Sequence, residues 1–259
     1  MASLRARRAQ PPALLRPLGV AWQDVYWLSL QGRAWQLTTL VTSICVFNMR
    51  HYTSKSVSPQ IVLASASPRR FELLQQIGVK AIVQDVDINE SQKPGEPVME
   101  YVQRLAMEKA QCGFATMENE HKIPVLGADT IVEVKGVIFG KPENRQQAKK
   151  MLQQLSGQKH TVHTSVAIVT EDKNIIDTSS SQVSFKVLQE QEIDCYLATG
   201  EADDKAGSYA VQGIAAQFIK NINGSFSGVM GLPLYETAQL LKQCGVSLLH
   251  EYKNNKEDL

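Results

Sequence analysis

The segment Ser-Ala-Ser-Pro-Arg-Arg at residues 65–70 has the composition of an anion-binding turn. It ends a strand-like run and opens a helix, for which Ser67 can cap and Pro68 suits the first helical position. The unpaired N–H groups and the dipole at a helix start favour an anion, whereas Arg69 and Arg70 in that first turn oppose the dipole. A bound phosphate explains both arginines better than the alternative, two solvated side chains.

Lys109 falls on the apolar stripe of the longest expected helix, Pro97 to about Met117. At about 100° per residue, Lys109 lies about 20° from Val98, on the stripe that also holds Val102 and Leu105. A buried lysine is costly unless it is paired or faces a polar cavity. Lys109 therefore either points inward at an anion or carboxylate, or extends its ammonium group past the end of the stripe.

Asp129 and Thr130 interrupt an apolar strand-like run at 125–134. A carboxylate among Val, Leu and Ile side chains is either partnered or functional. Neighbouring residues of a straight strand face opposite sides of the sheet. If Asp129 and Thr130 both serve one site, we therefore expect the strand to end or bulge there.

Two further positions indicate a function only in combination with the residues above. Lys141 follows a hairpin-like segment and, alone, would be an ordinary turn lysine. Gln212 lies in the Gly-bracketed loop 207–213, where its amide could read a base edge as both donor and acceptor, or be a plain loop residue. With the cations above and the carboxylates Glu90 and Asp129, these residues indicate a nucleotide site with a divalent cation.

The elements that must position these residues alternate between strand-like and helix-like segments from Gln60 onward. Strands are expected at 61–67, 81–88, 125–134, 137–140, 160–170, 181–188 and 215–224, and helices at 68–78, 97–117, 144–155, 190–200 and 233–245. Alternation without a repeat predicts an α/β layer structure with a mixed sheet. The sequence contains no G-x-S-x-G, P-loop or G-x-G-x-x-G motif. Its four scattered cysteines and five histidines argue against a zinc site or a disulfide framework and fit a reducing compartment.

Composition divides the 259-residue chain in two. With 43% hydrophobic and 20% charged residues, the chain is neither wholly disordered, collagen-like nor a polytopic membrane protein. Residues 1–58 hold seven Lys/Arg and the single acid Asp24, so the remainder has 20 basic and 25 acidic residues. An acidic main part disfavours sequence-independent nucleic-acid binding.

Residues 1–58 are expected to be a disordered N-terminal extension, residues 59–250 the main domain and residues 251–259 a polar tail. The Arg-rich start overlaps with a transit peptide, but prolines interrupt it. The apolar run 37–47 is too short to span a bilayer, which takes about 20 residues. A dispensable tail, read from an early start codon upstream of Met49, is favoured over a transit or membrane-associating segment. RNA binding by the basic extension is a less favoured alternative.

Eight segments, matching in order and spacing, carry a resemblance to the Maf family of nucleoside triphosphate pyrophosphatases over about 59–250. They are LASASPRRFELL, DINE (87–90), RLAMEKA (104–110), VLGADTIV, GKP (140–142), LSG (155–157), DKAGSYAVQG and GLPLYET. The resemblance implies a mixed, elongated sheet with flanking helices and two lobes around a central cleft, as in Maf and ITPase proteins. It further implies a homodimer. From the charge, the cysteines and the short apolar run we expect a cytoplasmic protein with no nucleic acid or membrane as partner.

The same resemblance implies hydrolysis of the α–β phosphate bond of a nucleoside triphosphate, with Mg²⁺ or Mn²⁺ as cofactor. Asp129 corresponds to the catalytic acidic residue and Glu90 to the charged cleft. We expect both to hold the metal, with Asp129 acting as general base or as metal ligand. The implied substrate-binding residues are Ser65, Arg69, Arg70, Lys109, Thr130, Lys141 and Gln212. Arg69, Thr130 and Gln212 resemble the branch acting on dTTP and UTP, where the 7-methyl-GTP branch carries Trp, Gln and Glu. The alternative is a non-catalytic nucleotide-sensing regulator of cell division.

Overall fold

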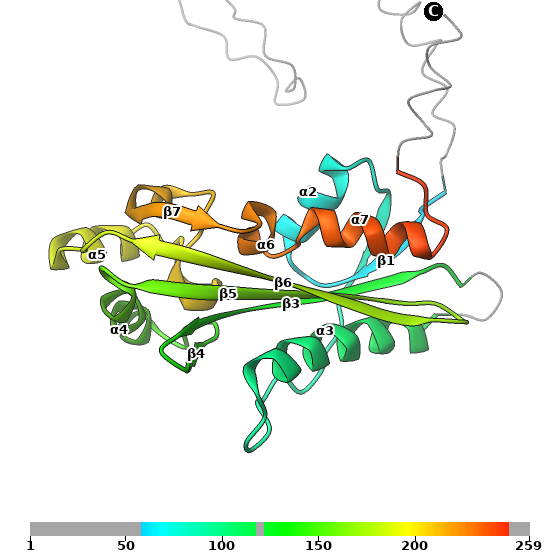
Figure 1. The fold of residues 1–259 in the computed structure, drawn as a ribbon, viewed down its shortest axis with the longest axis horizontal. Coiled ribbons are helices and arrows are strands. Elements are labelled where there is room, and N and C mark those ends of the chain that lie inside the picture. The colour runs from blue at the N-terminus through cyan, green and yellow to red at the C-terminus, as the bar shows by residue number, and fades with distance from the viewer. Residues whose placement is uncertain (1–57, 118–121, 249–259) are drawn as a thin grey trace, which may run out of the picture. The chain divides into compact units, whose positions relative to one another are not determined.

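A computed structural model describes residues 58–117 and 122–248, which form one α/β unit (Figure 1). The expected extension, apart from Ser58, and the expected tail lie outside these residues. The strands are β1 Ile61–Ala64, β2 Ala81–Gln84, β3 Val125–Val134, β4 Val137–Phe139, β5 Lys159–Val169, β6 Asn174–Phe185 and β7 Ile219–Asn223. They form one sheet in the order β2-β1-β3-β5-β6-β7, with β4 paired to β3. Because β1 is parallel to its neighbours and the other pairs are antiparallel, the predicted mixed sheet is confirmed.

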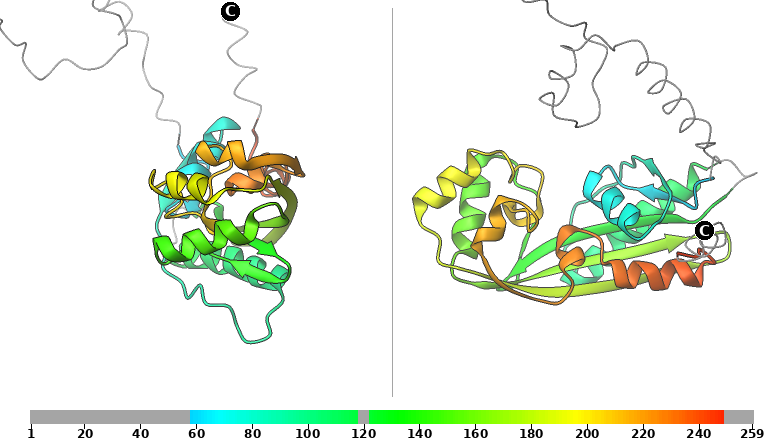
Figure 2. Two further views of the ribbon diagram at one scale, coloured as in Figure 1. Left: turned by 90° about the vertical axis from the view of Figure 1, so that its left-hand side faces the viewer. Right: turned by 90° about the horizontal axis from the view of Figure 1, so that it is seen from above.

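Helices cover both faces of this sheet. They are α2 Pro68–Gln76, α3 Val98–Ala115, α4 Arg145–Leu155, α5 Glu190–Leu197, α6 Phe226–Met230 and α7 Leu234–Gln243, with 3₁₀ turns η3 Ala206–Ser208 and η4 Ile214–Phe218. Helix α3 packs along β3 and β5 on one face, and α2, α6 and α7 lie on the other (Figure 1). Figure 2 shows α4 and α5 at one end of the long strands and α2 and α7 at the other. In the described residues no helix is long and apolar enough to cross a membrane.

The two largest hydrophobic cores of the described residues lie along the sheet, and they correspond to the two expected lobes. The first core packs α2 and α7 on the sheet and includes Leu63, Leu74, Leu126, Ile168 and Leu241. The second core is rich in aromatic side chains and includes Phe139, Leu152, Phe185, Tyr196 and Phe218. Because β3 and β5 contribute to both cores, the strands hold the two lobes in one sheet, with the space between them available for a site.

The edge of β3 between the two cores is open. On that side β1 pairs with β3 only as far as Gly127, and β4 begins its pairing at Val132. Residues 128–131 therefore have no strand partner on this side in the described part of the chain. On the other side β3 keeps a continuous register with β5 from Val125 to Glu133. The expectation that β3 must end or bulge at Asp129 is wrong, because the neighbouring strands stop instead.

Several expected boundaries also differ. The run 215–224 is not one strand, because residues up to Phe218 form η4 and only the rest form β7. The carboxylate of Glu201 accepts hydrogen bonds from the N–H groups of Ile214 and Ala215, which stabilises the helical turn. Likewise β1 and β2 end at Ala64 and Gln84, short of the expected ends, since the chain turns away from the sheet at both points.

Candidate active site

A cavity of about 500 Å³ lies at the open edge of β3. Its walls come from the β1–α2 turn, β3, α3, the loop after β4 and the loop that includes η3. All nine residues predicted for the site line it: Ser65, Arg69, Arg70, Glu90, Lys109, Asp129, Thr130, Lys141 and Gln212. The fold thus brings together residues from positions 65 to 212, while the role of each stays a prediction.

The β1–α2 turn is built to leave helix N–H groups available. Ser65 turns the chain, with its hydroxyl accepting from the Ser67 N–H at 3.2 Å. Ser67 occupies the N-cap position of α2, but its side chain makes no capping hydrogen bond, so that expectation is wrong. Pro68 fills the first helical turn, as predicted. The first N–H groups of a helix left uncapped in this way are suited to an anion.

Arg70 donates hydrogen bonds to three neutral oxygens. We call Arg70 and its partners Ser65, Thr130 and Gly231 the arginine face of the cavity. Its Nε donates to the Gly231 carbonyl at 2.8 Å, its Nη1 to the Ser65 hydroxyl at 3.0 Å and its Nη2 to the Thr130 hydroxyl at 3.3 Å. Burial lowers the pKa of Arg70, an effect that the charge of Asp129 opposes. No carboxylate of the described residues forms an ion pair with Arg70, although the charges of Asp129 and Glu90 nearby partly offset its own.

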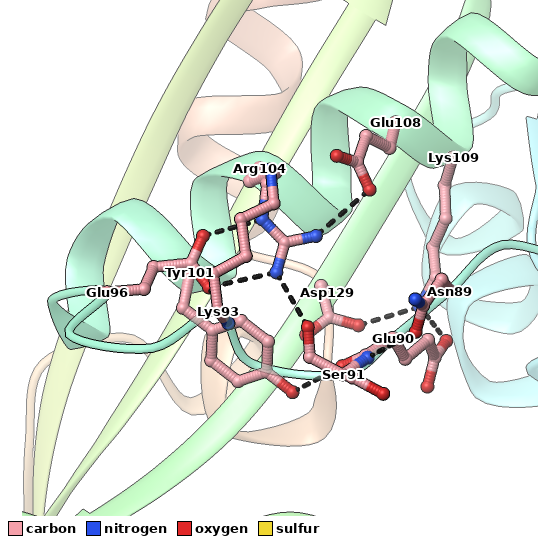
Figure 3. A network of polar contacts seen from close by, with 10 residues as sticks. All are labelled: Asn89, Glu90, Ser91, Lys93, Glu96, Tyr101, Arg104, Glu108, Lys109 and Asp129. Atoms are coloured by element: carbon pink, nitrogen blue, oxygen red, sulfur yellow. Dashed lines mark hydrogen bonds and ion pairs between the residues drawn. The ribbon is translucent and has the colours of Figure 1, made fainter.

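Lys109 points inward and joins two carboxylates, which we call the carboxylate face: Glu90, Lys109 and Asp129 (Figure 3). Its Nζ lies 2.6 Å from Glu90 Oε1 and 2.7 Å from Asp129 Oδ1. Lys109 and Asp129 are both 8% exposed, and the Glu90 side chain is half exposed. Burial would raise the pKa of Glu90, but the hydrogen bond and charge of Lys109, with Lys141 and Arg70, lower it overall. Glu90 therefore stays ionised at neutral pH.

The mouth of the cavity holds the remaining predicted residues. Lys141 and Gln212 are exposed there, on the second-core side. Arg69, on the first-core side, has its Nη1 3.7 Å from Asp204 Oδ2 across the mouth. Asp204 was not predicted as a site residue, although it lies three residues before Gly207, where the Gly-bracketed loop begins.

Tyr101 was not predicted from the sequence as a site residue, but it lines the cavity from α3. Its hydroxyl donates to the Glu90 carbonyl at 2.8 Å. Its position three residues after Val98 and eight before Lys109 could have signalled this, because it lies on the same side of α3 as the stripe. Asp85 also lines the cavity and had no distinguishing sequence signal.

The carboxylates offer a divalent cation only part of its ligands. In the described part of the chain no group of three or more His, Cys, Asp or Glu residues could hold a metal ion. Glu90 and Asp129 are close through Lys109, which already contacts one oxygen of each. Mg²⁺ takes one or two carboxylates and completes its shell with waters and substrate phosphates. The donor set therefore fits a metal that arrives with a phosphate ligand, and not a cage made by protein alone.

The family model and the curated relatives indicate the same family. A family model described as "Maf-like protein" matches residues 60–244. A protein named dTTP/UTP pyrophosphatase from Nitrosospira multiformis is 50% identical over 202 residues, covering 74% of this chain and 98% of that protein. One of the same name from Aromatoleum aromaticum is 47% identical over 206 residues, covering 75% and 100%. The solved Staphylococcus aureus Ham1 protein is 14% identical, with a TM-score of 0.34 over 48% of this chain and 71% of that chain.

Proposed function

This chain belongs to the Maf family, and from that membership and its cavity we propose that it hydrolyses dTTP and UTP to the nucleoside monophosphate and pyrophosphate. Modified pyrimidine nucleotides are further candidate substrates, which would make the enzyme a sanitiser of the nucleotide pool. The observation that carries the proposal is that Arg70, which is hydrogen-bonded only to neutral oxygens, and the Lys109-bound carboxylates line one cavity at an open strand edge. We place the activity in residues 59–250, which contain the family match.

The triphosphate binds along the arginine face. The uncapped start of α2 presents N–H groups, and the Arg70 fork is already oriented by Ser65, Thr130 and Gly231. A guanidinium held in this way can form two parallel hydrogen bonds to phosphate oxygens without further ordering. Arg69 and Lys141 add positive charge at the mouth, where the outer phosphates of the substrate would lie.

The reaction takes place beside the carboxylate face. A water oxygen attacks the α-phosphorus, the bond to the bridging α–β oxygen breaks, and pyrophosphate leaves. Asp129 accepts a proton from that water or orients it, as general acid–base catalysis requires a group within hydrogen-bond reach. Lys109 holds the Asp129 carboxylate by a 2.7 Å contact inside the cavity, which fixes its direction.

We propose that Glu90 and Asp129 also bind the divalent cation, Mg²⁺ or Mn²⁺. When bound, such an ion neutralises charge that develops on the phosphate oxygens. Lys109 keeps the two carboxylates close together before any ion arrives, because its ammonium offsets their mutual repulsion. Homodimer formation and a cytoplasmic location stay predictions.

Base selection is assigned to Arg69, Thr130 and Gln212. Gln212 is exposed and free to turn its amide toward a pyrimidine edge. Thr130 acts differently, because its hydroxyl oxygen already accepts from Arg70 at 3.3 Å and from Thr164 at 3.0 Å. We infer that Thr130 contributes by placing Arg70, and that Gln212 makes the direct contact with the base.

A panel of nucleoside triphosphates, incubated with the full chain and Mg²⁺, tests the function. We expect dTTP and UTP to give monophosphate and pyrophosphate fastest, and purine triphosphates to react more slowly. Release of diphosphate and inorganic phosphate would contradict the proposed bond cleavage. Nucleotide binding without any product would favour the regulator that the sequence left as the alternative.

A further inference from the structure

The segment that carries Glu90 contains no helix or strand, although the Glu90 carboxylate must be placed within the cavity. Residues 85–97 link β2 to α3 without joining the sheet. We propose that Tyr101 and Arg104 of α3 are positioning residues that fasten this segment and thereby fix Glu90. The proposal rests on the proposed function. We call Tyr101, Arg104 and Glu96 the loop clamp (Figure 3).

Tyr101 fastens the backbone at Glu90 itself. Its hydroxyl donates to the Glu90 carbonyl at 2.8 Å, while Lys109 of the same helix contacts the Glu90 carboxylate at 2.6 Å. One rigid element thus holds both ends of this residue. The two contacts restrict the Glu90 side chain more than either contact alone, because the backbone cannot shift while the carboxylate stays in place.

Arg104 fastens the segment on both sides of a short loop. Its Nη2 donates to the Ser91 carbonyl at 3.0 Å. Its Nε and Nη2 donate to the two carboxylate oxygens of Glu96 at 2.5 and 2.9 Å. The side chains of Arg104 and Glu96 are only 14% and 8% exposed, unlike those of an ordinary surface pair. A two-pronged contact of this kind fixes direction as well as distance.

Glu96 also accepts hydrogen bonds from within the loop. Its Oε2 accepts from the Lys93 N–H at 2.9 Å, and its carbonyl accepts from the Gln92 side chain at 2.8 Å. The hydrogen bond from Arg104 is the largest cause that lowers the pKa of Glu96 to about 2. Glu96 is therefore ionised at neutral pH, where the loop clamp stays closed.

Arg104 does not line the cavity, so its effect on turnover must pass through the segment it holds. Glu108 provides a matched control within the same cluster. It contacts Arg104 Nη1 at 3.1 Å from one turn further along α3, and it does not touch the segment. Loss of Glu108 removes one i,i+4 pair within α3 and leaves the contacts of Arg104 with Ser91 and Glu96 intact.

The experiment compares Arg104→Gln, Arg104→Lys and Glu108→Gln in the full chain. We expect Arg104→Gln to lower kcat by about tenfold to a hundredfold, since small misplacement of a catalytic group has effects of this size. Arg104→Lys should restore little, because a lysine cannot contact both Glu96 oxygens and Ser91 together. Glu108→Gln should stay within about twofold. Equal losses in Arg104→Gln and Glu108→Gln would overturn the proposal.

A double-mutant cycle with Glu90→Gln separates positioning from general damage. If Arg104 acts through Glu90, Arg104→Gln should lower kcat by less than about twofold in the Glu90→Gln background. A full additional loss there would show that Arg104 acts by another route. If Arg104→Gln does not fold, Tyr101→Phe removes a single hydrogen bond and should show the same non-additivity with a smaller loss.

Hydrogen exchange of the 87–96 amides supplies a readout independent of turnover. We expect Arg104→Gln to exchange these amides at least about tenfold faster, while Glu108→Gln and wild type behave alike. Unchanged exchange would overturn the loop clamp. If wild type hydrolysed no triphosphate, the proposed function would fail, and exchange would still decide whether Arg104 holds the segment.

Discussion

The carboxylate face and the arginine face of the cavity differ in how charge is balanced, although Asp129 of the one and Thr130 of the other are neighbours in the chain. On the carboxylate face, Lys109 contacts Asp129 and Glu90, so its charge is met inside the protein. On the arginine face, the three partners of Arg70 are two hydroxyls and a carbonyl. The first face pairs its cation and keeps one excess negative charge, whereas the second holds a cation that has no ion-pair partner in the described residues.

From this difference we infer that the arginine face binds phosphate and that the carboxylate face carries the chemistry. Neutral acceptors fix the direction of a guanidinium without cancelling its charge, which suits a phosphate-binding position. Removing one partner from a buried ion pair leaves an uncompensated charge, so the carboxylate face is the more sensitive to substitution. Three substitutions or groups of substitutions test whether binding and chemistry divide in this way, and a fourth, outside both faces, tests the pH dependence of stability.

The largest effect is expected from Asp129→Asn, on the carboxylate face. We expect pyrophosphate release to fall by about 10²- to 10⁴-fold, because the water loses its acceptor or guide. The fold should survive, since Lys109 keeps its contact with Glu90. Initial rates measure pyrophosphate release, and a thermal unfolding curve measures the stability of the fold. The control is Asp194→Asn, which removes a 2.8 Å contact with Lys149 on the second lobe. Near wild-type turnover in Asp129→Asn would remove Asp129 from the chemistry.

Arg70→Lys probes the arginine face, with an effect expected to be smaller and of another kind. The lysine keeps the charge but cannot reach Gly231, Ser65 and Thr130 together, so the phosphate loses an oriented fork. We expect KM to rise about tenfold to a hundredfold with a smaller change in kcat. Arg145→Lys, at an exposed contact with the Asp194 carbonyl, is the control. A loss confined to kcat would erase the distinction between the faces.

The combination Arg69→Trp with Gln212→Glu changes the mouth, which both faces share. We expect the ratio of dTTP to GTP turnover, compared as kcat/KM, to fall at least about tenfold, because a mispaired base leaves hydrogen-bonding groups unsatisfied. Thermal unfolding should change little, since Gln212 is exposed. If the double variant kept the full pyrimidine preference, base selection would have to lie elsewhere.

The smallest effect on turnover is expected at His160, which lies outside both faces. Its Nε2 is 2.8 Å from the Tyr209 hydroxyl, and burial lowers the pKa of His160 to about 4. An unfolded chain therefore binds a proton more tightly, so stability is complete above about pH 6.5 and falls as the pH drops towards 4. The loss reaches about 3 kcal/mol at most.

Urea unfolding at pH 7 and pH 4.5 measures this dependence, with His160→Gln as the comparison. We expect the difference between the two pH values to be smaller in His160→Gln than in wild type, with turnover at pH 7 within a few-fold. An identical pH dependence in the two proteins would show that His160 does not titrate as its burial indicates.

Much of the site could be anticipated because its signals are local. Helical spacing alone placed Lys109 on an apolar stripe, and the Pro-Arg-Arg start of α2 followed from residue types. The error at the start of β7 has a different cause, a contact with a residue distant in the sequence. The helical turn before β7 depends on Glu201, which lies 13 residues from Ile214, and no local pattern in 215–224 reports such a partner.

By itself the sequence determined which chemistry was available, namely arginines at a helix start, a lysine and carboxylates in apolar surroundings, and an amide in a glycine-bracketed loop. Only the tertiary structure decided that Asp129 and Thr130 line the same cavity, because β1 and β4 leave the same stretch of β3 uncovered. It also decided which carboxylates meet Lys109 and which oxygens hold Arg70. Residue type and periodicity fix local geometry within a few residues, whereas these contacts depend on where distant strands stop pairing.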